Sequence, residues 1–507
     1  MLASFIRMDS RVSSHSTKKA HKGTAFFSFD QIFCDLFYAN VHFFIKMRTK
    51  PCKYEKFLVI LRRIFNILLK MEKKVALTEE LIEPIEQQEE QKAPMLDAFF
   101  RIHDFLVDHA FMPIRRQLMD EIDWNDRLIA IKGGRGVGKT DFLLTRIKEI
   151  ETEWKNTPDP EPGKGRRRPR KSKKDIRPCL YVSLNDFYFT EHSLLDLAAD
   201  FVKTGGKYLF FDQLFKYPNW SRELKRCYSR FRDLNIVFCA TPVMPIDEEN
   251  NDLKDIVKTY NLRGFSFREY LNLQTGLRLR SYSLEEIIQR HASISREICE
   301  RVHPLDYFKA YLHHGYYPSY LESKSFEAEL LKTMNSQLEV DVLMIKQIDV
   351  ACLHKLRKLL YILLREAPGP LNVSNIYEEI GLSRATVMNY IKYLKDSRLI
   401  NLLYPEDKNF PMKPTRVYIH NPNLAQMIFT REVAPMDLYE TYFYTAIHGS
   451  HKVNATERSA MFIVDNSHYF DVREKTSVRD TIRPTAVAEL ELGRGNQIPL
   501  WLLGFIY

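Results

Sequence analysis

The sequence predicts an α/β protein in which a parallel sheet carries a phosphate-binding loop. Two observations predict this fold. Between residues 127 and 239, short apolar runs of strand length alternate with helical segments, which is typical of a parallel sheet. The first of these runs, Arg127–Lys132, ends directly at a glycine-rich loop that a helix follows. Strand, glycine loop and helix in this order form the usual setting of a phosphate-binding turn.

The other elements of this first domain follow in order. Apolar residues at helical spacing from Phe99 to Trp124 predict helices before the first strand. Four further runs are expected after the glycine loop and its helix (Asp141–Glu151): strands at Cys179–Leu184, Tyr208–Phe211 and Ile236–Cys239, and a helix at Trp220–Phe231. We therefore place an ATPase-like core at residues 96–275.

Beyond residue 275 the pattern becomes helical, with expected helices at 284–302, 304–314 and 324–364. We assign residues 276–350 to a helical lid, 351–430 to a winged helix and 431–507 to a small C-terminal α/β domain. Strands of that last domain are expected at Phe462–Val464 and Ile498–Ile506. The whole is thus a parallel-sheet P-loop NTPase domain followed by a lid, a winged helix and a small α/β domain.

Composition limits the class of protein. Hydrophobic residues make up 45% and charged residues 28% of the chain, which predicts packed domains. The net charge of +10 favours acidic partners such as nucleotides, nucleic acid or anionic lipid. The seven cysteines form no CxxC pair and no zinc spacing, which favours reduced thiols in a cytoplasmic protein. With no apolar run of membrane-spanning length, no integral membrane segment is expected.

Three segments fall outside the predicted domains. Residues 1–70 end in a basic amphipathic stretch, Phe57–Lys70, and are either a membrane-surface helix, a packed extension or sequence upstream of a translation start at Met71. Residues 71–95 form an acidic linker. Residues 155–178 are a basic, Pro/Gly-rich insertion, which is either a solvated loop or a nonspecific contact for nucleic-acid phosphates.

The glycine loop matches the pattern G-x-x-x-x-G-K-[ST] over eight residues: Gly133, Gly134, Arg135, Gly136, Val137, Gly138, Lys139 and Thr140. Glycines let the backbone N–H groups wrap a phosphate closely, and the following helix adds the positive end of its dipole. Lys139 is expected to contact the β- and γ-phosphates and Thr140 to ligate Mg²⁺. ATP and Mg²⁺ are therefore the predicted ligands.

The second part of the predicted site is the apolar strand that ends in Asp212, which we expect to face the metal beside Thr140. The next residue is Gln213. An amide can orient a water molecule but cannot accept its proton, so slow hydrolysis is predicted.

These residues resemble those of prokaryotic AAA-superfamily ATPases with a C-terminal domain of unknown function. The resemblance runs from Arg127 to the C-terminus and is carried by six stretches: Gly133–Thr140, Tyr181–Asp186, Tyr208–Trp220, Gly264–Leu271, Gly315–Pro318 and Ile498–Tyr507. It implies an AAA core, a helical lid, a winged helix and a C-terminal domain similar to restriction endonucleases.

The sequence departs from this family at several places. Relatives usually carry Glu in place of Gln213, and Thr-Gly-Ser-Ser in place of Cys239–Pro242, where Thr241 alone could still sense a γ-phosphate. Asp255 and Ile256 stand near the position of an arginine pair, so an arginine finger is in doubt, and residues 155–178 are an insertion. Three of the departures predict weakened hydrolysis.

Contact with nucleic acid is an open alternative. Residues 372–395 read as helix, turn and helix, with Gly381 at the turn and Ser383 as the cap of the second helix. Val387, Ile391 and Leu394 are expected in the core. The residues that could face DNA are Arg384, Thr386, Asn389, Lys392 and Lys395.

The last domain contains residues of the types that a metal nuclease needs: Asp465, Asp471, Glu474 and Lys475. Because Met461 stands where relatives tend to place an acidic residue, we predict a catalytically silent domain. The leading hypothesis is a nucleotide-controlled contact with DNA or an unknown protein partner. The alternatives are a non-hydrolysing, nucleotide-dependent scaffold and an ATPase-gated nuclease.

Overall fold

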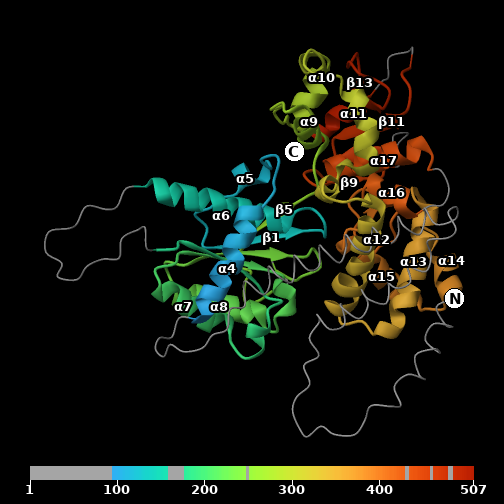
Figure 1. Ribbon diagram of the computed structural model, residues 1–507. Helices are drawn as coiled ribbons and strands as arrows, with labels where there is room; N and C mark the ends of the chain where they lie inside the picture. Colours follow the sequence, from blue (N-terminus) through green and yellow to red (C-terminus); the bar gives the residue numbers. More distant parts are fainter. Residues whose placement is uncertain (1–93, 158–175, 247–249, 429–432, 457–460, 478–482) are drawn as a thin grey trace, which may run out of the picture. The chain divides into compact units, whose positions relative to one another are not determined.

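The computed structural model describes residues 94–507 except 158–175, 247–249, 429–432, 457–460 and 478–482 (Figure 1). These residues belong to one compact unit. The predictions for residues 1–70, for the acidic linker before Pro94 and for most of the basic insertion lie outside the described residues.

A five-stranded parallel sheet forms the core of the first domain, in the order β2-β3-β4-β1-β5. Its strands are β1 (Leu128–Gly133), β2 (Cys179–Ser183), β3 (Tyr208–Asp212), β4 (Asn235–Ala240) and β5 (Lys258–Leu262). The sheet confirms the predicted parallel α/β core. The chain crosses from β1 to the sheet edge at β2 and returns through β3 and β4, so the loops after β1, β3 and β4 meet at one edge.

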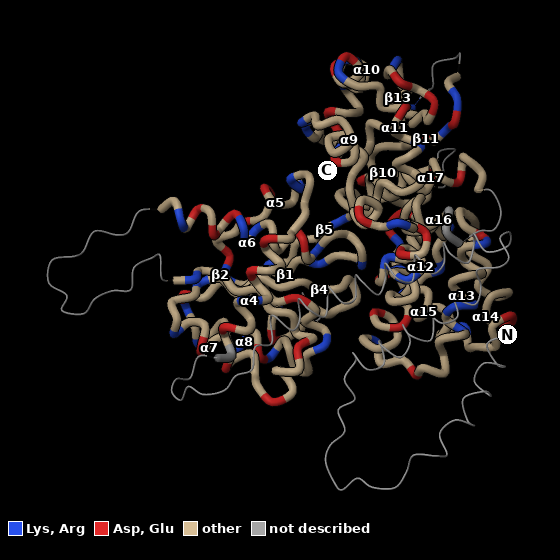
Figure 2. The backbone as a smooth tube through the Cα atoms, in the orientation of Figure 1, with Lys and Arg blue, Asp and Glu red and all other residues tan. Residues whose placement is uncertain are grey.

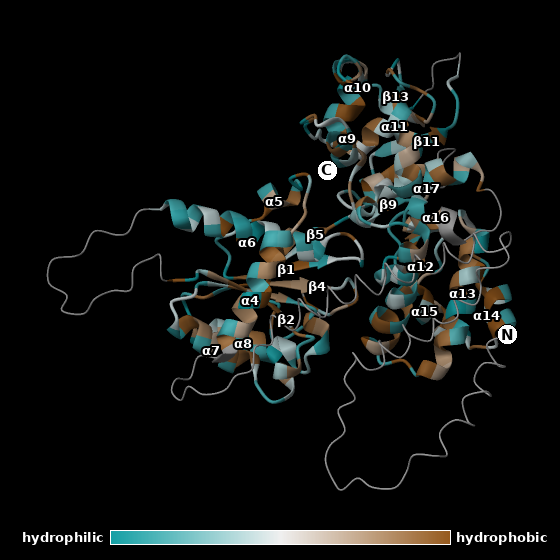
Figure 3. Ribbon diagram, viewed as in Figure 1, coloured by the Kyte–Doolittle hydropathy of each residue, from teal (hydrophilic) through white to brown (hydrophobic). Residues whose placement is uncertain are grey.

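Helices cover both faces of this sheet: α4 (Pro94–His109), α5 (Leu118–Glu121), α6 (Lys139–Asn156), α7 (Leu194–Lys203) and α8 (Trp220–Arg230) (Figure 1). Successive strand residues point to opposite faces. Ile129 and Ile131 accordingly share a core cluster with Phe142 of α6, whereas Leu128 and Ala130 belong to the cluster that contains α7 and α8. Apolar strands covered on both sides appear brown in Figure 3.

Strand β5 was missed by the sequence analysis. Its sequence, Lys-Thr-Tyr-Asn-Leu, is mostly polar, and only Leu262 is fully buried. An edge strand has one paired side and can keep polar side chains in water, so it lacks the apolar run that marked β1 to β4. It pairs in register with β1 and places Leu262 beside Gly133.

The next region is helical, as predicted, but more broken. It contains α9 (Phe267–Thr275), α10 (Leu284–Cys299), α11 (Pro304–Ala310), α12 (Phe326–Ser336) and α13 (Leu353–Glu366). The expected helical run 324–364 is wrong in detail, because α12 passes into a π-helix at Gln337–Met344 and a short 3₁₀-helix at Val350–Cys352 precedes α13. A second π-helical turn, Tyr311–Gly315, follows α11.

A small three-stranded sheet and three helices follow. The elements are β6 (Gly369–Pro370), α14 (Val373–Ile380), α15 (Arg384–Asp396), β7 (Ile400–Leu403), β8 (Arg416–Ile419) and α16 (Pro422–Ile428), with antiparallel strands in the order β6-β8-β7. Gly381 ends α14 at φ 68°, and the Ser383 side chain accepts from Thr386 N at the start of α15. Val387, Ile391 and Leu394 are buried, as predicted.

The chain ends in a second five-stranded sheet packed on α17 (Pro435–His448). Its strands are β9 (Val453–Asn454), β10 (Phe462–Val464), β11 (His468–Arg473), β12 (Thr485–Val487) and β13 (Gln497–Pro499). The β10 prediction is confirmed, but the expected strand at Ile498–Ile506 is wrong: after Pro499 the chain forms a 3₁₀-helix over Leu500–Phe505. That run is buried on all sides, so its apolar content does not distinguish strand from helix.

Charges of both signs are interspersed along the chain (Figure 2). In the described part of the chain, no helix is long and apolar enough to span a bilayer. The five cysteines in that part are all free thiols, and three of them, Cys179, Cys227 and Cys239, are buried.

Candidate functional site

The glycine loop has a backbone that only glycine adopts readily. Gly136 and Gly138 have φ values of 78° and 86°, in the left-handed region. A Cβ added at Gly133 would lie 2.7 Å from the Leu262 carbonyl oxygen of β5. The loop leads directly into α6, which begins at Lys139, so the free N–H groups of that helix end face the same space.

Lys139 lies inside the loop. Its Nζ donates to the carbonyl oxygens of Gly133 at 2.8 Å and Gly134 at 2.7 Å. Burial lowers the pKa of this ammonium group. The ammonium group of Lys139 is bonded to two carbonyl oxygens in a largely buried site, so a bound anion would stabilise its charge further.

The two predicted metal ligands meet. The Thr140 hydroxyl donates to Asp212 Oδ2 at 2.6 Å, and the Tyr181 hydroxyl donates to the same oxygen at 3.0 Å. Asp212 Oδ1 accepts from the backbone N–H of Gln213 at 2.7 Å, and the carboxylate is 6% exposed. A hydroxyl and a fixed carboxylate are the hard oxygen donors that Mg²⁺ takes alongside phosphate oxygens. Tyr181, whose hydrogen bond orients Asp212, was not assigned a role from the sequence.

Gln213 and Thr241 both line the same cavity as Lys139. Gln213 has φ 54°, which turns the chain sharply after β3. Thr241 follows β4 and is 4% exposed, yet its hydroxyl oxygen has no hydrogen-bond partner among the described residues. A buried, unsatisfied hydroxyl is costly, and it is the kind of group that a ligand oxygen satisfies.

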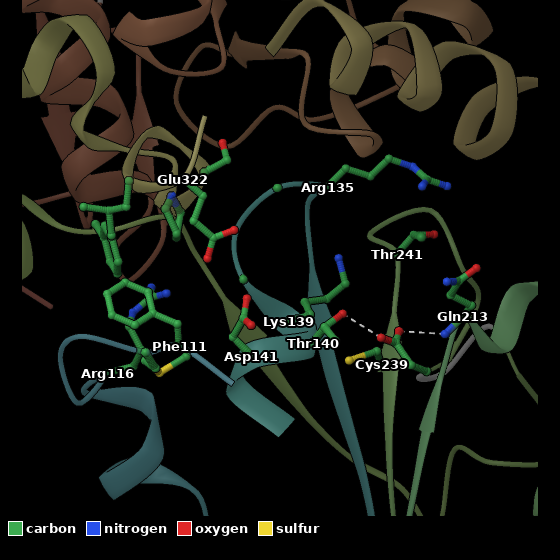
Figure 4. A pocket seen from close by; sticks show the side chains of 18 of the residues that line it. Phe111, Arg116, Arg135, Lys139, Thr140, Asp141, Gln213, Cys239, Thr241 and Glu322 are labelled. Atoms are coloured by element: carbon green, nitrogen blue, oxygen red, sulfur yellow. Dashed lines mark hydrogen bonds between the residues drawn. The ribbon is translucent and has the colours of Figure 1, made fainter. Parts of the chain in front are cut away.

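The cavity itself has a volume of about 400 Å³ and two chemically different ends. Lys139, Thr140, Asp212 and Thr241 form the polar end. Phe111 and Arg116 lie on the opposite side of Lys139 and Thr140 from Thr241 and Gln213 (Figure 4). The apolar lining residues are Phe111, Met112, Pro113, Phe215, Ala240, Phe265, Pro318 and Leu321. This division suits a molecule with a phosphate tail and a planar apolar base.

Arg135, the third residue of the loop, turns away from Thr140 (Figure 4). Its Nε and Nη2 donate to both oxygens of Asp341 at 2.8–3.1 Å. Asp341 belongs to the π-helix Gln337–Met344, and its side chain is 0% exposed. The loop is therefore joined to the helical region that follows the first domain by an ion pair whose carboxylate is fully buried.

Sequence reasoning missed Arg116, which is 3% exposed. It donates to Glu269 Oε1 at 3.1 Å, to the Val137 carbonyl oxygen at 3.3 Å and to the Gly264 carbonyl oxygen at 3.0 Å. It therefore ties the segment between α4 and α5 to the glycine loop. The sequence around Arg116 gives no signal of this role, because the residues that Arg116 contacts lie far along the chain.

Asp141 and Glu322 were also missed. Both carboxylates line the cavity, and Figure 4 shows them on the same side of the loop. Burial, followed by the negative charge of Glu322, raises the pKa of Asp141 to about 6. A carboxyl that titrates near neutrality beside a cavity is a candidate for proton exchange with a bound ligand.

Comparison with known proteins decides the class of the first domain. Residues 125–271 match the family described as AAA domain. The chain contains an AAA domain. Residues 305–426 match a domain of unknown function, DUF8612.

Two further similarities are weaker. An uncharacterised protein of Methanocaldococcus jannaschii is 23% identical over 307 residues, and the match spans 58% of this chain but only 60% of that protein. A solved structure of Caenorhabditis elegans PCH-2 aligns with 12% identity over 60% of this chain and 67% of that chain, with a TM-score of 0.20.

The predicted DNA-facing residues lie away from the AAA-domain cavity, on α15. Arg384 and Asn389 are exposed, and Thr386 and Lys392 are half-buried. The Thr386 hydroxyl lies 2.8 Å from the Ser383 hydroxyl, and Lys392 Nζ lies 5.3 Å from the centre of the Phe410 ring. Thr386 thus contributes to the helix cap, whereas Arg384, Asn389 and Lys395 are the exposed members of the five candidates.

The nuclease candidates are spread over the last sheet. Asp471 accepts from the backbone N–H of Met461 at 3.2 Å, and Asp465 accepts from His451 at 2.6 Å. Within the described ranges, no group of three or more His, Cys, Asp or Glu side chains could hold a metal ion.

The unpartnered Thr241 hydroxyl leads to a specific expectation for Thr241→Val. The variant keeps the shape of the side chain and removes a buried, unsatisfied oxygen, so the melting temperature should stay the same or rise. ATP binding should weaken by about tenfold, which corresponds to one lost hydrogen bond to a charged group, with ADP binding unchanged. Calorimetric titration with both nucleotides measures this; equal losses for ATP and ADP would contradict it.

Proposed function

We propose that the chain binds ATP with Mg²⁺ in the AAA-domain cavity. The observation that carries this proposal is the meeting of Lys139, Thr140 and Asp212 at the polar end of that cavity. Lys139 would exchange its carbonyl partners for β- and γ-phosphate oxygens, and the loop N–H groups would hold the remaining phosphate charge. Thr140 and Asp212 would hold the metal, which supplies charge neutralisation when it is bound.

The apolar end of the AAA-domain cavity would hold the purine base of the nucleotide. Phe111 is 54% exposed at the cavity, and Phe265 is buried at 2%. Aromatic and proline surfaces favour a stacked purine over solvent. Arg116 holds the glycine loop in place by donating to the Val137 carbonyl oxygen, so we assign Arg116 a positioning role.

Slow hydrolysis is the second part of the proposal. Gln213 follows Asp212 at the polar end, where it can orient a water molecule but cannot remove its proton. A variant with a carboxylate of the same length at this position supplies the missing base.

Gln213→Glu is therefore expected to raise the rate of phosphate release from ATP by about tenfold to a hundredfold, the lower range of general-base effects. Phosphate release measured at saturating ATP and Mg²⁺ tests it. Gln213→Ala is the matched control, since it removes the amide without adding a base and should not raise the rate. An unchanged rate in Gln213→Glu would refute the idea that the missing carboxylate limits turnover.

We further propose that the nucleotide state controls a contact elsewhere in the chain. The Arg135–Asp341 pair is the observation behind this step, because any movement of the loop on nucleotide binding changes the environment of the π-helix. The order α13, β6, α14, α15, β7, β8, with antiparallel strands in the order β6-β8-β7, supports a winged helix at residues 351–430. DNA or a protein is the partner that such a module would contact.

If DNA is that partner, binding should be salt-sensitive and should depend on Arg384. Arg384→Gln is expected to weaken binding of a duplex oligonucleotide about threefold to tenfold at low salt and to reduce the salt dependence by about one charge. Arg357→Gln on α13 is the control, because that side chain is paired with Glu339 at 2.7 Å. Fluorescence anisotropy across a salt series measures both. Equal affinities for the two variants would favour a protein partner or the nucleotide-dependent scaffold.

A further inference from the structure

A second cavity lies on the outer side of the glycine loop. It has a volume of about 350 Å³ and is lined by the ends of β1 and β5 and by α15, β7 and α17. A Cβ built on Gly134 would lie 3.9 Å from Arg398 Cδ, so the cavity adjoins the loop but does not share its interior. Of the candidate residues considered above, Lys395, a possible DNA contact, lines it.

The lining of this cavity is strongly basic. It includes four Lys or Arg side chains, two histidines and a single carboxylate: Lys132, Arg263, Lys395, Arg398, His420, His448 and Asp396. The chain folds these cations together from segments more than a hundred residues apart. Such a concentration of positive charge is unfavourable unless something neutralises it.

The two arginines are fixed by neutral groups. Arg398 donates to Asn261 Oδ1 at 3.0 Å and lies 3.5 Å from the Leu262 carbonyl oxygen. Arg263 donates to the Thr445 carbonyl oxygen at 2.6 Å and stacks 3.6 Å from the Tyr507 ring centre. Its Nη1 is buried and has no hydrogen-bond partner within the part of the chain that the structure describes. The acceptors of both guanidinium groups in these hydrogen bonds are neutral oxygens.

The positive charges around His420 also affect its protonation. His420 Nδ1 lies 3.1 Å from Asn401 Oδ1, an acceptor, so this nitrogen carries the ring proton. Burial, followed by the charges of Arg398, His448 and Arg263, holds the pKa of His420 below its usual range. Hydrogen bonds to neutral groups therefore fix Arg263, Arg398 and His420 at the edge of this cavity.

We propose that this cavity is a second anion-binding site, which takes the phosphate group of a small phosphorylated molecule or a free phosphate ion. The Arg398 guanidinium, whose hydrogen bonds go to neutral acceptors, supplies the fixed donors, and Lys395, which is exposed at the rim, adds long-range attraction. The volume admits a compound of mononucleotide size. A bound anion would contact the AAA domain, α15 and α17 at once, and would therefore hold these elements together.

The test uses the full chain carrying Lys139→Ala, which is expected to weaken phosphate binding at the glycine loop strongly. Calorimetric titration of this variant with pyrophosphate at low salt should still show one binding site. This result does not depend on the ATP proposal, which is tested by the loss of ATP affinity in Lys139→Ala. Absence of pyrophosphate binding in the Lys139→Ala chain would overturn the second site.

Two further substitutions in that background locate the site. Arg398→Gln and Lys395→Gln should each weaken pyrophosphate binding, by about tenfold or more for the inner arginine and about threefold for the rim lysine. Lys392→Gln is the matched control, since it lies one turn earlier on α15 and does not line the cavity. Melting temperatures check that Arg398→Gln folds, and Lys395→Gln, at an exposed position, keeps the test valid if it does not. Equal affinities in all three variants would overturn the proposal.

The source of the phosphate follows from two more titrations. Tighter binding of adenosine monophosphate than of inorganic phosphate would support a small phosphorylated molecule, and equal binding would support the free ion. A single-stranded oligonucleotide that binds more tightly than pyrophosphate, and that Lys392→Gln weakens as much as Lys395→Gln, would instead show a nucleic-acid surface and overturn the small-molecule site.

Discussion

Replacement of Lys139 by Ala is expected to weaken ATP binding by about a hundredfold or more. The Lys139 ammonium group is held inside the loop by two carbonyl oxygens, and burial already lowers its pKa. Charge-assisted hydrogen bonds to phosphate contribute about 1.5–3 kcal/mol each, and this side chain is positioned to make two of them. Loss of about 3 kcal/mol corresponds to a factor of about 150 in the dissociation constant.

Titration with a fluorescent ATP analogue in the presence of Mg²⁺ measures this loss. Lys148→Ala is the matched control: Lys148 lies about two and a half turns further along α6, is exposed, and does not line the cavity. Its affinity should match that of the unmodified chain. Removal of Mg²⁺ should weaken binding in the unmodified chain as well, because Thr140 and Asp212 then face the phosphates without the metal between them. Retention of full affinity by Lys139→Ala would remove the basis for the ATP proposal.

The polar half of this site could be predicted because it is encoded locally. The loop is eight consecutive residues, and Asp212 ends an apolar strand whose position in the sheet follows from strand and helix alternation. Parallel strands end at the same edge, so Thr140 and Asp212 had to approach one another. The hydrogen bond of 2.6 Å between them confirms that they do.

The rest of the site could not be predicted, because its residues carry no local signal. Arg135 and Asp341 are 206 positions apart, and Arg116 and Glu269 are 153 apart. An arginine in a glycine loop or before a short helix looks like an ordinary exposed side chain until its buried partner is known. The polar edge strand β5 was missed because its conformation follows from pairing with β1, and the 3₁₀-helix Leu500–Phe505 was mistaken for a strand because a fully buried apolar run has no distinguishing periodicity.

The same buried pair gives the largest expected effect on stability. Arg135→Met is expected to lower the free energy of unfolding by about 3 kcal/mol at neutral pH, because it leaves the Asp341 carboxylate, 0% exposed, without its partner. Burial already raises the pKa of Asp341, and Arg135 opposes that rise through its charge and hydrogen bonds. Without Arg135 the folded-state pKa of Asp341 moves further above the unfolded value.

The sign of the pH dependence follows from this shift. Between the unfolded pKa of about 4 and the raised folded value, the folded variant binds a proton that the unfolded chain has lost, so its stability falls as pH rises. The loss caused by Arg135→Met should therefore be smaller at pH 5 than at pH 8. Urea unfolding at the two pH values measures the difference.

Two controls separate this pair from a general effect of losing an arginine. Arg357→Met breaks an exposed pair with Glu339, two residues before Asp341, and should cost less than about 1 kcal/mol with no such pH dependence. The double variant Arg135→Met/Asp341→Leu removes the buried charge and should recover most of the lost stability. If the double variant is as unstable as Arg135→Met, the loss of stability comes from lost packing and not from the unpaired Asp341 charge. The ion pair would then not be the link that couples the glycine loop to the π-helix.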